Sequence, residues 1–217
     1  MKRAVRIIAA VVIILMGVLD AMAIEEAPYK VLKSSGTFEL REYAPHILAE
    51  AVVEGDLESA GSTAFRRLFR YISGENRSRG TIAMTAPVSQ EQAGEKIRMT
   101  APVGQQRAGK MWAVSFTMPA GYTMETLPTP DDPTIMLRQV PPRRMAAVRY
   151  SGFWSESSYL RHKSELESWI RGNGLTFAGD PVWARYNPPF TPWFMRRNEI
   201  LIPVAEVSGR NESERPR

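Results

Sequence analysis

The sequence predicts an α+β fold: a curved antiparallel sheet or distorted β-barrel, flanked by two helices and built from two pseudo-symmetric halves. Three observations predict it. Several stretches alternate apolar and polar residues, as half-buried strands do, and two longer stretches carry apolar residues at helical spacing. Part of the chain also recurs after an offset of 97 residues, and in each copy a helix follows a pair of strands.

The clearest strand covers residues 112–118, where Trp112, Val114 and Phe116 alternate with small or polar residues. Three further apolar stretches are also expected to be strands: 47–53, 145–150 and 200–202.

Two helices are expected, one in each half. The first covers residues 58–72, because apolar residues recur there at spacings of three and four. The second covers residues 157–171, and glycines at 172 and 174 end it. The apolar sides consist of Ala64, Phe65, Leu68 and Ile72 in the first helix and Tyr159, Leu166, Trp169 and Ile170 in the second.

The internal repeat aligns residues 40–46 with residues 137–143. At the same offset, Gly55 meets Gly152. Each half then contains a strand, a proline-bearing turn, a second strand, a glycine and a helix. We therefore expect the two halves, about 28–111 and 112–205, to superpose.

The N-terminal segment, residues 1–23, predicts a secretory signal peptide. Its basic start precedes thirteen uncharged residues, and Ala21-Met22-Ala23 matches a cleavage site. The apolar run is too short to span a bilayer comfortably. Cleavage gives a periplasmic or secreted protein that begins at Ile24. The alternative is that the segment is not cleaved and anchors the protein, and we expect membrane association only in that case.

Composition excludes several classes of protein. The chain has no cysteine, so it has no disulfide frame, no lipoprotein anchor and no covalent C-x-x-C-H haem site. Cleavage of residues 1–23 removes three basic residues and one acidic residue, which lowers the net charge from +5 to +3. Much of the basic character therefore belongs to the targeting segment, and we expect no nucleic-acid partner. Residues 208–217 are polar and charged, and we expect a disordered tail.

A short phrase occurs twice: residues 84–88, Met-Thr-Ala-Pro-Val, return as residues 99–103. Each proline holds the preceding alanine extended, and a polar, glycine-containing stretch separates the copies. These features predict the two arms of a hairpin. Its small residues let another surface approach, and Met84 and Met99 offer adaptable contacts. A sheet edge packed on a helix is the alternative.

These two copies, with residues 184–204 (ARYNPPFTPWFMRRNEILIPV), resemble the SOUL haem-binding protein family. The resemblance runs from about residue 29 to residue 204, and we assign a SOUL domain to residues 24–207. It implies a barrel of two βαβ-type halves, related to gyrase-inhibitor-like effector-binding domains. It also implies non-covalent binding of haem or another tetrapyrrole in an apolar groove beside the first helix. Some animal relatives have a histidine in the stretch where this chain has Glu42.

A haem site needs an apolar slot and cations for two propionates, and arginine pairs well with carboxylates. The arginines of the first helix and of the loop after it are the candidate cations: Arg66, Arg67, Arg70, Arg77 and Arg79. Phe190 is a further candidate for the apolar slot. A place in the core, or on a solvated helix face, is the alternative for each. The predicted tetrapyrrole contacts are Phe65, Arg66, Phe69, Arg70, Met84, Met99 and His162.

The axial ligand, if the iron has one, stays open. His46 follows Pro45 and is interpreted as an exposed turn residue. His162 falls on the apolar side of the second helix, where a buried, hydrogen-bonded histidine is the alternative to an iron ligand. Other groups that bind iron in principle are Tyr43, Met84, Met99 and Tyr186.

Near the C-terminus, three prolines between residues 188 and 192 predict a rigid loop, and Asn198 and Glu199 open the last strand. We expect these two side chains to pair with Arg41 or Arg138 and to hold the halves together.

The sequence contains no G-x-S-x-G elbow, H-E-x-x-H motif or P-loop, and we expect no enzyme. The favoured function is an exported haem or tetrapyrrole binder, for carriage or buffering. The alternatives are a binder of another hydrophobic small molecule and, less favoured, an enzyme acting on tetrapyrroles.

Overall fold

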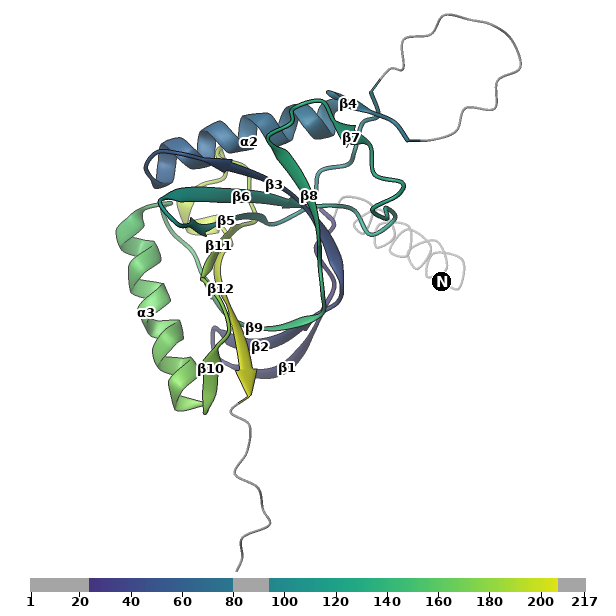
Figure 1. Cartoon of the computed structure of the whole chain (residues 1–217). Helices are drawn as coiled ribbons and strands as arrows, with labels where there is room; N and C mark the ends of the chain where they lie inside the picture. Colours follow the sequence, from purple (N-terminus) through teal and green to yellow (C-terminus); the bar gives the residue numbers. More distant parts are fainter. Residues whose placement is uncertain (1–23, 80–93, 207–217) are drawn as a thin grey trace, which may run out of the picture.

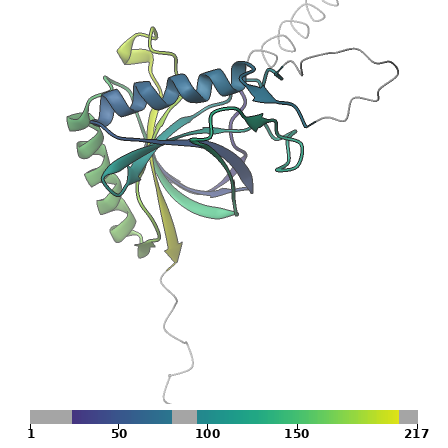
Figure 2. The same ribbon diagram turned by 45° about the horizontal axis from the view of Figure 1, so that its top comes forward.

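The structure is a computed structural model that describes residues 24–79 and 94–206 (Figure 1). Within these residues, ten strands form one curled antiparallel sheet. Helices α2 (Leu57–Ser73) and α3 (Glu156–Gly172) lie on its outer side (Figure 1). The turned view shows α2 crossing in front of the sheet, while α3 runs down its side (Figure 2).

The strand order joins the two halves of the chain into one sheet: β1-β2-β9-β12-β11-β5-β6-β3-β8, with β10 paired to β12. Strands β4 and β7 form a separate pair beside the end of α2. The bounds in chain order are β1 (Tyr29–Ser35), β2 (Phe38–Tyr43), β3 (His46–Val53), β4 (Asn76–Arg77), β5 (Val103–Ala108), β6 (Met111–Thr117), β7 (Thr129–Pro130), β8 (Ile135–Val140), β9 (Arg143–Tyr150), β10 (Leu175–Phe177), β11 (Val182–Arg185) and β12 (Asn198–Glu206).

Helix α2 has a capped start and a glycine end. The side chain of Asp56 accepts hydrogen bonds from the backbone N–H groups of Glu58 and Ser59, at 2.9 and 2.8 Å. Such a cap satisfies N–H groups that lack partners within the helix. Gly74, with φ of 120°, ends α2. The buried side of α2 packs on β3 and β6, and their apolar residues form the larger core.

Helix α3 packs on β9, β10 and β12, where Leu166 and Ile170 are fully buried in a second core. The side chain of Ser155 caps its start. Since side chains alternate across a strand, the same strands send their other residues inward, where a third, smaller cluster includes Met145 and Leu201.

The bounds of the elements follow the offset of 97 residues. Strands β2 and β3, shifted by that number, have the bounds of β8 and β9. Gly55 and Gly152 each lie between a strand and a helix, with φ of 124° and 138°. The predicted fold class, curled sheet and two helices, is confirmed, and α2 and α3 extend the predicted helices by one residue at each end. The superposition of the two halves stays a prediction.

Some expectations fall outside the described residues: the signal peptide, the tail at 208–217 and the first arm of the hairpin, with Met84. In the second arm, Ala101 makes a single bridge to Glu26, and Val103 opens β5. No helix in the described part of the chain is long and apolar enough to cross a membrane.

Candidate ligand-binding groove

A groove of about 410 Å³ lies beside α2, over the outer face of β5 and β6. Pockets that hold small organic ligands typically measure about 300–1,000 Å³. We call this site the α2 groove. Its lining consists of Ile24, Gly61, Ser62, Phe65, Arg66, Met99, Thr100, Ala101, Val103, Gln105, Val114, Trp154, Arg185, Tyr186, Asn187, Pro188 and Pro189.

Helix α2 contributes four residues to this lining, 61, 62, 65 and 66, which one helical turn places on the same face. Gly61 lets the Gln105 side chain lie close, because a Cβ atom there would be 3.0 Å from Oε1 of Gln105 and would push that side chain aside. The ring of Phe65 packs edge-on against Phe116 with centroids 5.3 Å apart, so its position is fixed by the core below.

Arg185 supplies a cation to this apolar wall. One guanidinium nitrogen donates to Oε1 of Gln105 at 2.7 Å, and the guanidinium lies 4.2 Å from the ring centre of Trp183. Burial lowers the pKa of Arg185 to about 10, so the group is charged at neutral pH. Among the described residues, the Nε atom of Arg185 has no hydrogen-bond partner and its guanidinium forms no ion pair. An anionic group of a ligand would satisfy it.

The proline-rich loop forms the rim of the α2 groove. Arg196 donates to the backbone oxygens of Thr191 and Pro189, both at 2.8 Å, and a short 3₁₀ helix spans Trp193–Met195. These bonds agree with the rigid loop predicted from the prolines. Phe190 is 86% exposed and does not line the groove, unlike the prolines before it.

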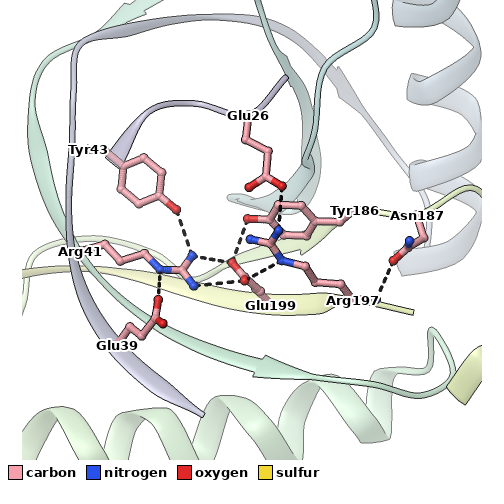
Figure 3. A network of polar contacts seen from close by, with 8 residues as sticks. All are labelled: Glu26, Glu39, Arg41, Tyr43, Tyr186, Asn187, Arg197 and Glu199. Atoms are coloured by element: carbon pink, nitrogen blue, oxygen red, sulfur yellow. Dashed lines mark hydrogen bonds and ion pairs between the residues drawn. The ribbon is translucent and has the colours of Figure 1, made fainter. Parts of the chain in front are cut away.

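Behind the groove, a network of polar contacts surrounds the buried carboxylate of Glu199 (Figure 3). Arg41 donates two hydrogen bonds to it, at 2.6 and 3.1 Å, and Arg197 donates one at 3.0 Å. The hydroxyl of Tyr186 donates a further bond at 2.8 Å. Burial alone would raise the pKa of Glu199, but these hydrogen bonds and the arginine charges hold it below its usual value. The predicted pairing of Glu199 with Arg41 is confirmed, whereas Arg138 pairs with Glu50.

Three of the predicted contacts, Phe65, Arg66 and Met99, meet in the α2 groove. Phe69 stacks on Phe65 but does not line the groove, and Arg70 points to Glu75, with 3.6 Å between Nε and Oε2. The other arginines of the predicted cluster also bond elsewhere: Arg67 to Thr134, Arg77 to Asp131, and Arg79 to Thr129 and the backbone of Met124.

Neither histidine lines the α2 groove. The ring of His162, on α3, stacks on Tyr150 with centroids 4.0 Å apart, and its Nδ1 lies 2.8 Å from Oε2 of Glu165. The interpretation of His46 as an exposed turn residue is wrong. It is the first residue of β3 and is half-buried, because the curl of the sheet encloses it.

Sequence reasoning missed Arg185 and Trp154 as lining residues. A signal was present: a strand of apolar residues, 182–184, ends in an arginine directly before the proline-rich loop. Which way that arginine points depends on β5 and β6, which are distant in sequence.

The SOUL heme-binding protein family matches residues 24–203. The chain belongs to this family. Among SOUL relatives, mouse "Heme-binding protein 1" is 24% identical over 186 residues, which cover 83% of this chain and 93% of the mouse protein. Human "Heme-binding protein 2" is 27% identical over 191 residues, which cover 86% of this chain and 88% of the human protein.

Solved structures share the fold of this SOUL protein at low sequence identity. The C-terminal domain of EcmrR has a TM-score of 0.52 and 15% identity, covering 82% of this chain and 99% of that domain. A hydrolase from Listeria innocua has a TM-score of 0.53 and 11% identity, covering 80% and 94%. At these identities the likeness concerns the fold and not the activity.

Proposed function

We propose that this SOUL protein binds haem or a related tetrapyrrole non-covalently in the α2 groove. The observation that carries the proposal is Arg185, a charged group without an anionic partner among the described residues, in a largely apolar wall. Haem combines the same two properties, a flat apolar ring and carboxylates. The family of this chain and its two relatives are named for heme binding, which supports this class of ligand. The absence of cysteine agrees with non-covalent binding.

The ring would contact the apolar side chains of the groove, among them Phe65 from α2 and Met99 from the segment before β5. Burial of apolar surface contributes roughly 25 cal/mol per Å². The propionates would meet Arg185 and Arg66, whose forked guanidinium groups match carboxylates. Exposed aromatic residues continue from the rim over the neighbouring loop: Phe153, Phe190, Trp193 and Phe194.

Binding in this groove does not require a histidine on the iron. Among the described lining residues, Met99 and Tyr186 are the groups able to ligate iron, and the Tyr186 hydroxyl already donates to Glu199. A site without a strong iron bond favours reversible binding, which suits carriage or buffering. We assign binding and not catalysis to the protein, so hemin recovered from the complex is expected to be chemically unchanged.

We further propose that the protein is exported. The basic start, apolar run and Ala21-x-Ala23 site support cleavage before Ile24. Mass spectrometry of protein from the native host's periplasmic fraction or medium is expected to give Ile24 as the first residue. Recovery of a membrane-bound form with an intact N-terminus would instead establish an anchor.

Titration of purified protein with hemin, followed at the Soret band, tests the ligand. Ser62 is exposed and lines the groove, so Ser62→Trp is expected to fill the site and to weaken binding at least tenfold. Ser73→Trp, near the other end of α2 and outside the groove, is the matched control with unchanged affinity. If hemin leaves the Soret band unchanged while an apolar dye binds and Ser62→Trp blocks the dye, the ligand is another hydrophobic molecule.

A further inference from the structure

A second cavity lies inside the curled sheet, on the opposite face of β5 and β6 from the α2 groove. Its volume is about 50 Å³, and it shares no lining residue with the groove. The alternation of strand residues explains the separation: Val103 and Gln105 face the groove, whereas Gly104 and Gln106 line this inner cavity. The inner cavity adjoins a larger one of about 400 Å³, with which it shares Ala27, His46 and Thr117.

Two arginines line the inner cavity, Arg138 from β8 and Arg143 from β9. Arg138 is paired, because it donates to Oε2 of Glu50 at 3.1 Å. Arg143 has no carboxylate partner in the described part of the chain, and its Nε is shielded from solvent without a hydrogen-bond partner. Among the described lining residues, the guanidinium groups of Arg138 and Arg143 face one carboxylate, that of Glu50, so one positive charge is uncompensated.

Arg143 is half-buried, so part of the water that would otherwise solvate its charge is removed, which is costly without a compensating partner. Burial lowers the pKa of Arg143, and the charge of Arg138 lowers it further. Most buried polar groups in proteins have a partner, so an exception calls for an explanation. A bound anion would supply both the missing charge and the missing acceptor.

His46 completes the lining on this side. Its Nδ1 lies 2.9 Å from the backbone oxygen of Ala44, which accepts the ring hydrogen. Burial lowers the pKa of His46, and the charges of Arg143 and Arg138 add to that effect. The remaining titratable and charged groups of the inner cavity are Tyr43 and Glu50. An anion bound between the two arginines would offset part of their positive charge, raise the pKa of His46 and so favour its protonation.

We propose that the inner cavity binds a small anion, a carboxylate or a phosphate group, held mainly by Arg143 with Arg138 and His46 beside it. A guanidinium pairs with either group through two parallel hydrogen bonds. The volume of about 50 Å³ exceeds the roughly 10–15 Å³ that a cavity needs to hold one water molecule, so there is room for a small anionic head. This site is independent of the tetrapyrrole proposed for the α2 groove.

The neighbouring cavity of about 400 Å³ has room for the rest of a longer molecule whose anionic head lies in the inner cavity. The anion is therefore either free or the head of such a molecule. Its two acidic side chains nearest the N-terminus are already paired, Glu25 with Arg98 at 2.8 Å and Glu26 with Arg197 at 2.7 Å. Its wall also contains the apolar side chains of Met118 and Pro119, against which an aliphatic tail would pack. Acetate and inorganic phosphate test the head alone, and hexanoate tests the head with a tail.

Proton NMR of the histidine rings provides the readout, because the chain has two histidines and His162 lies on the outer helix α3. Titration with phosphate, acetate or hexanoate, at constant ionic strength, is expected to shift the His46 signal saturably and to raise the pKa of His46. The His162 signal is the internal control and stays in place. Tighter binding of hexanoate than of acetate identifies a tailed ligand, and equal binding identifies a free anion.

Arg143→Gln is expected to lower the anion affinity, measured from the shift of the His46 signal, at least tenfold. Arg144→Gln is the matched control: the next residue along β9 points to the other face and pairs with Glu42. Without added anion, the Tm of Arg143→Met is expected to be no lower than that of the unaltered protein, because the substitution removes a cation that lacks a carboxylate partner in the described chain. With anion, this variant is expected to lose the rise in Tm that anion binding produces. If His46 responds to none of the three anions, or responds equally in Arg143→Gln, the proposal is wrong.

Discussion

Arg41 and Glu199 are 158 residues apart in the chain, yet they form two hydrogen bonds inside the curled sheet (Figure 3). Arg41 comes from β2 in the first half and Glu199 from β12 in the second, with β9 between them in the sheet. Both side chains are buried, so neither charge has water to replace its partner. The pair therefore joins the two halves of the SOUL domain at a point where a single substitution has a large effect.

Glu199→Gln is expected to destabilise the protein by about 3–5 kcal/mol, because it removes the fully buried carboxylate with which both Arg41 and Arg197 pair. Chemical denaturation measures the loss. Glu39→Gln is the control: Glu39 also accepts from Arg41, at 2.7 Å, but it is partly exposed, so the expected loss is no more than about 1 kcal/mol. Equal losses in the two variants would contradict the role given to burial.

The same carboxylate predicts an acid-sensitive stability. The pKa of Glu199 is lowered in the folded state, so its contribution is complete above the ordinary glutamate pKa. That contribution is lost as the pH falls from the ordinary value through the lower folded value. Thermal melts at decreasing pH are expected to show a shallower decline in Glu199→Gln than in the unaltered protein. Parallel declines would show that other groups dominate the acid transition.

Iron is expected to add little to tetrapyrrole binding, because no histidine lines the described part of the α2 groove. Iron-free protoporphyrin is expected to bind within about tenfold of hemin, a difference of at most ~1.4 kcal/mol. Fluorescence quenching and Soret titrations give the two affinities, and His46→Ala and His162→Ala are expected to change neither. If His162→Ala abolishes hemin binding but spares protoporphyrin, with unchanged circular dichroism, an axial histidine operates.

The arginines of the α2 region are expected to separate into two classes. Arg185→Gln removes a half-buried donor to a propionate. It is expected to lower the affinity for hemin about tenfold or more, since hydrogen bonds to charged groups contribute about 1.5–3 kcal/mol. The effect of Arg66→Ala is expected to be smaller, about 0.5–1 kcal/mol, because this side chain is exposed. Arg67→Ala and Arg70→Ala leave the affinity unchanged, because both groups bond outside the groove.

The dimethyl ester of protoporphyrin is the control for this series, because its carboxylates are masked. Its affinity is expected to be the same for the unaltered protein and for Arg185→Gln. A loss of ester binding in Arg185→Gln would mean that the substitution alters the shape of the groove and not its charge.

Gly55 and Gly152, the glycines that precede the two helices, are each expected to lower the stability of the protein when replaced by alanine. Gly152 has φ of 138° and open space where a Cβ atom would lie, so Gly152→Ala costs backbone strain alone, of order 1–3 kcal/mol. Gly55→Ala is expected to cost more, because its Cβ would also lie 2.8 Å from Oγ of Ser59. Combining it with Ser59→Ala is expected to recover the excess. Neutral substitutions at both sites would contradict the strained geometry.

The sequence by itself determined the elements of this protein, because they depend on local pattern. The spacing of apolar residues in 58–72 and 157–171 indicated both helices, and the shared offset of Gly55 and Gly152 marked the point where each helix follows its strands. The motif that contains Asn198 and Glu199 also indicated a structural pair with Arg41 or Arg138, and the structure has the pair of Glu199 with Arg41.

Tertiary structure decided which of the candidate residues share a site. Helical periodicity put Arg66 and Arg70 one turn apart, but the groove ends between them, and Arg70 turns to Glu75 instead. Arg185 and Arg143 carried no local signal of lacking an acidic partner, because such a partner depends on every strand packed around the side chain. The curl of the sheet also enclosed His46, which its turn-like sequence did not predict. Burial and pairing depend on contacts between distant segments, and no local pattern contains them.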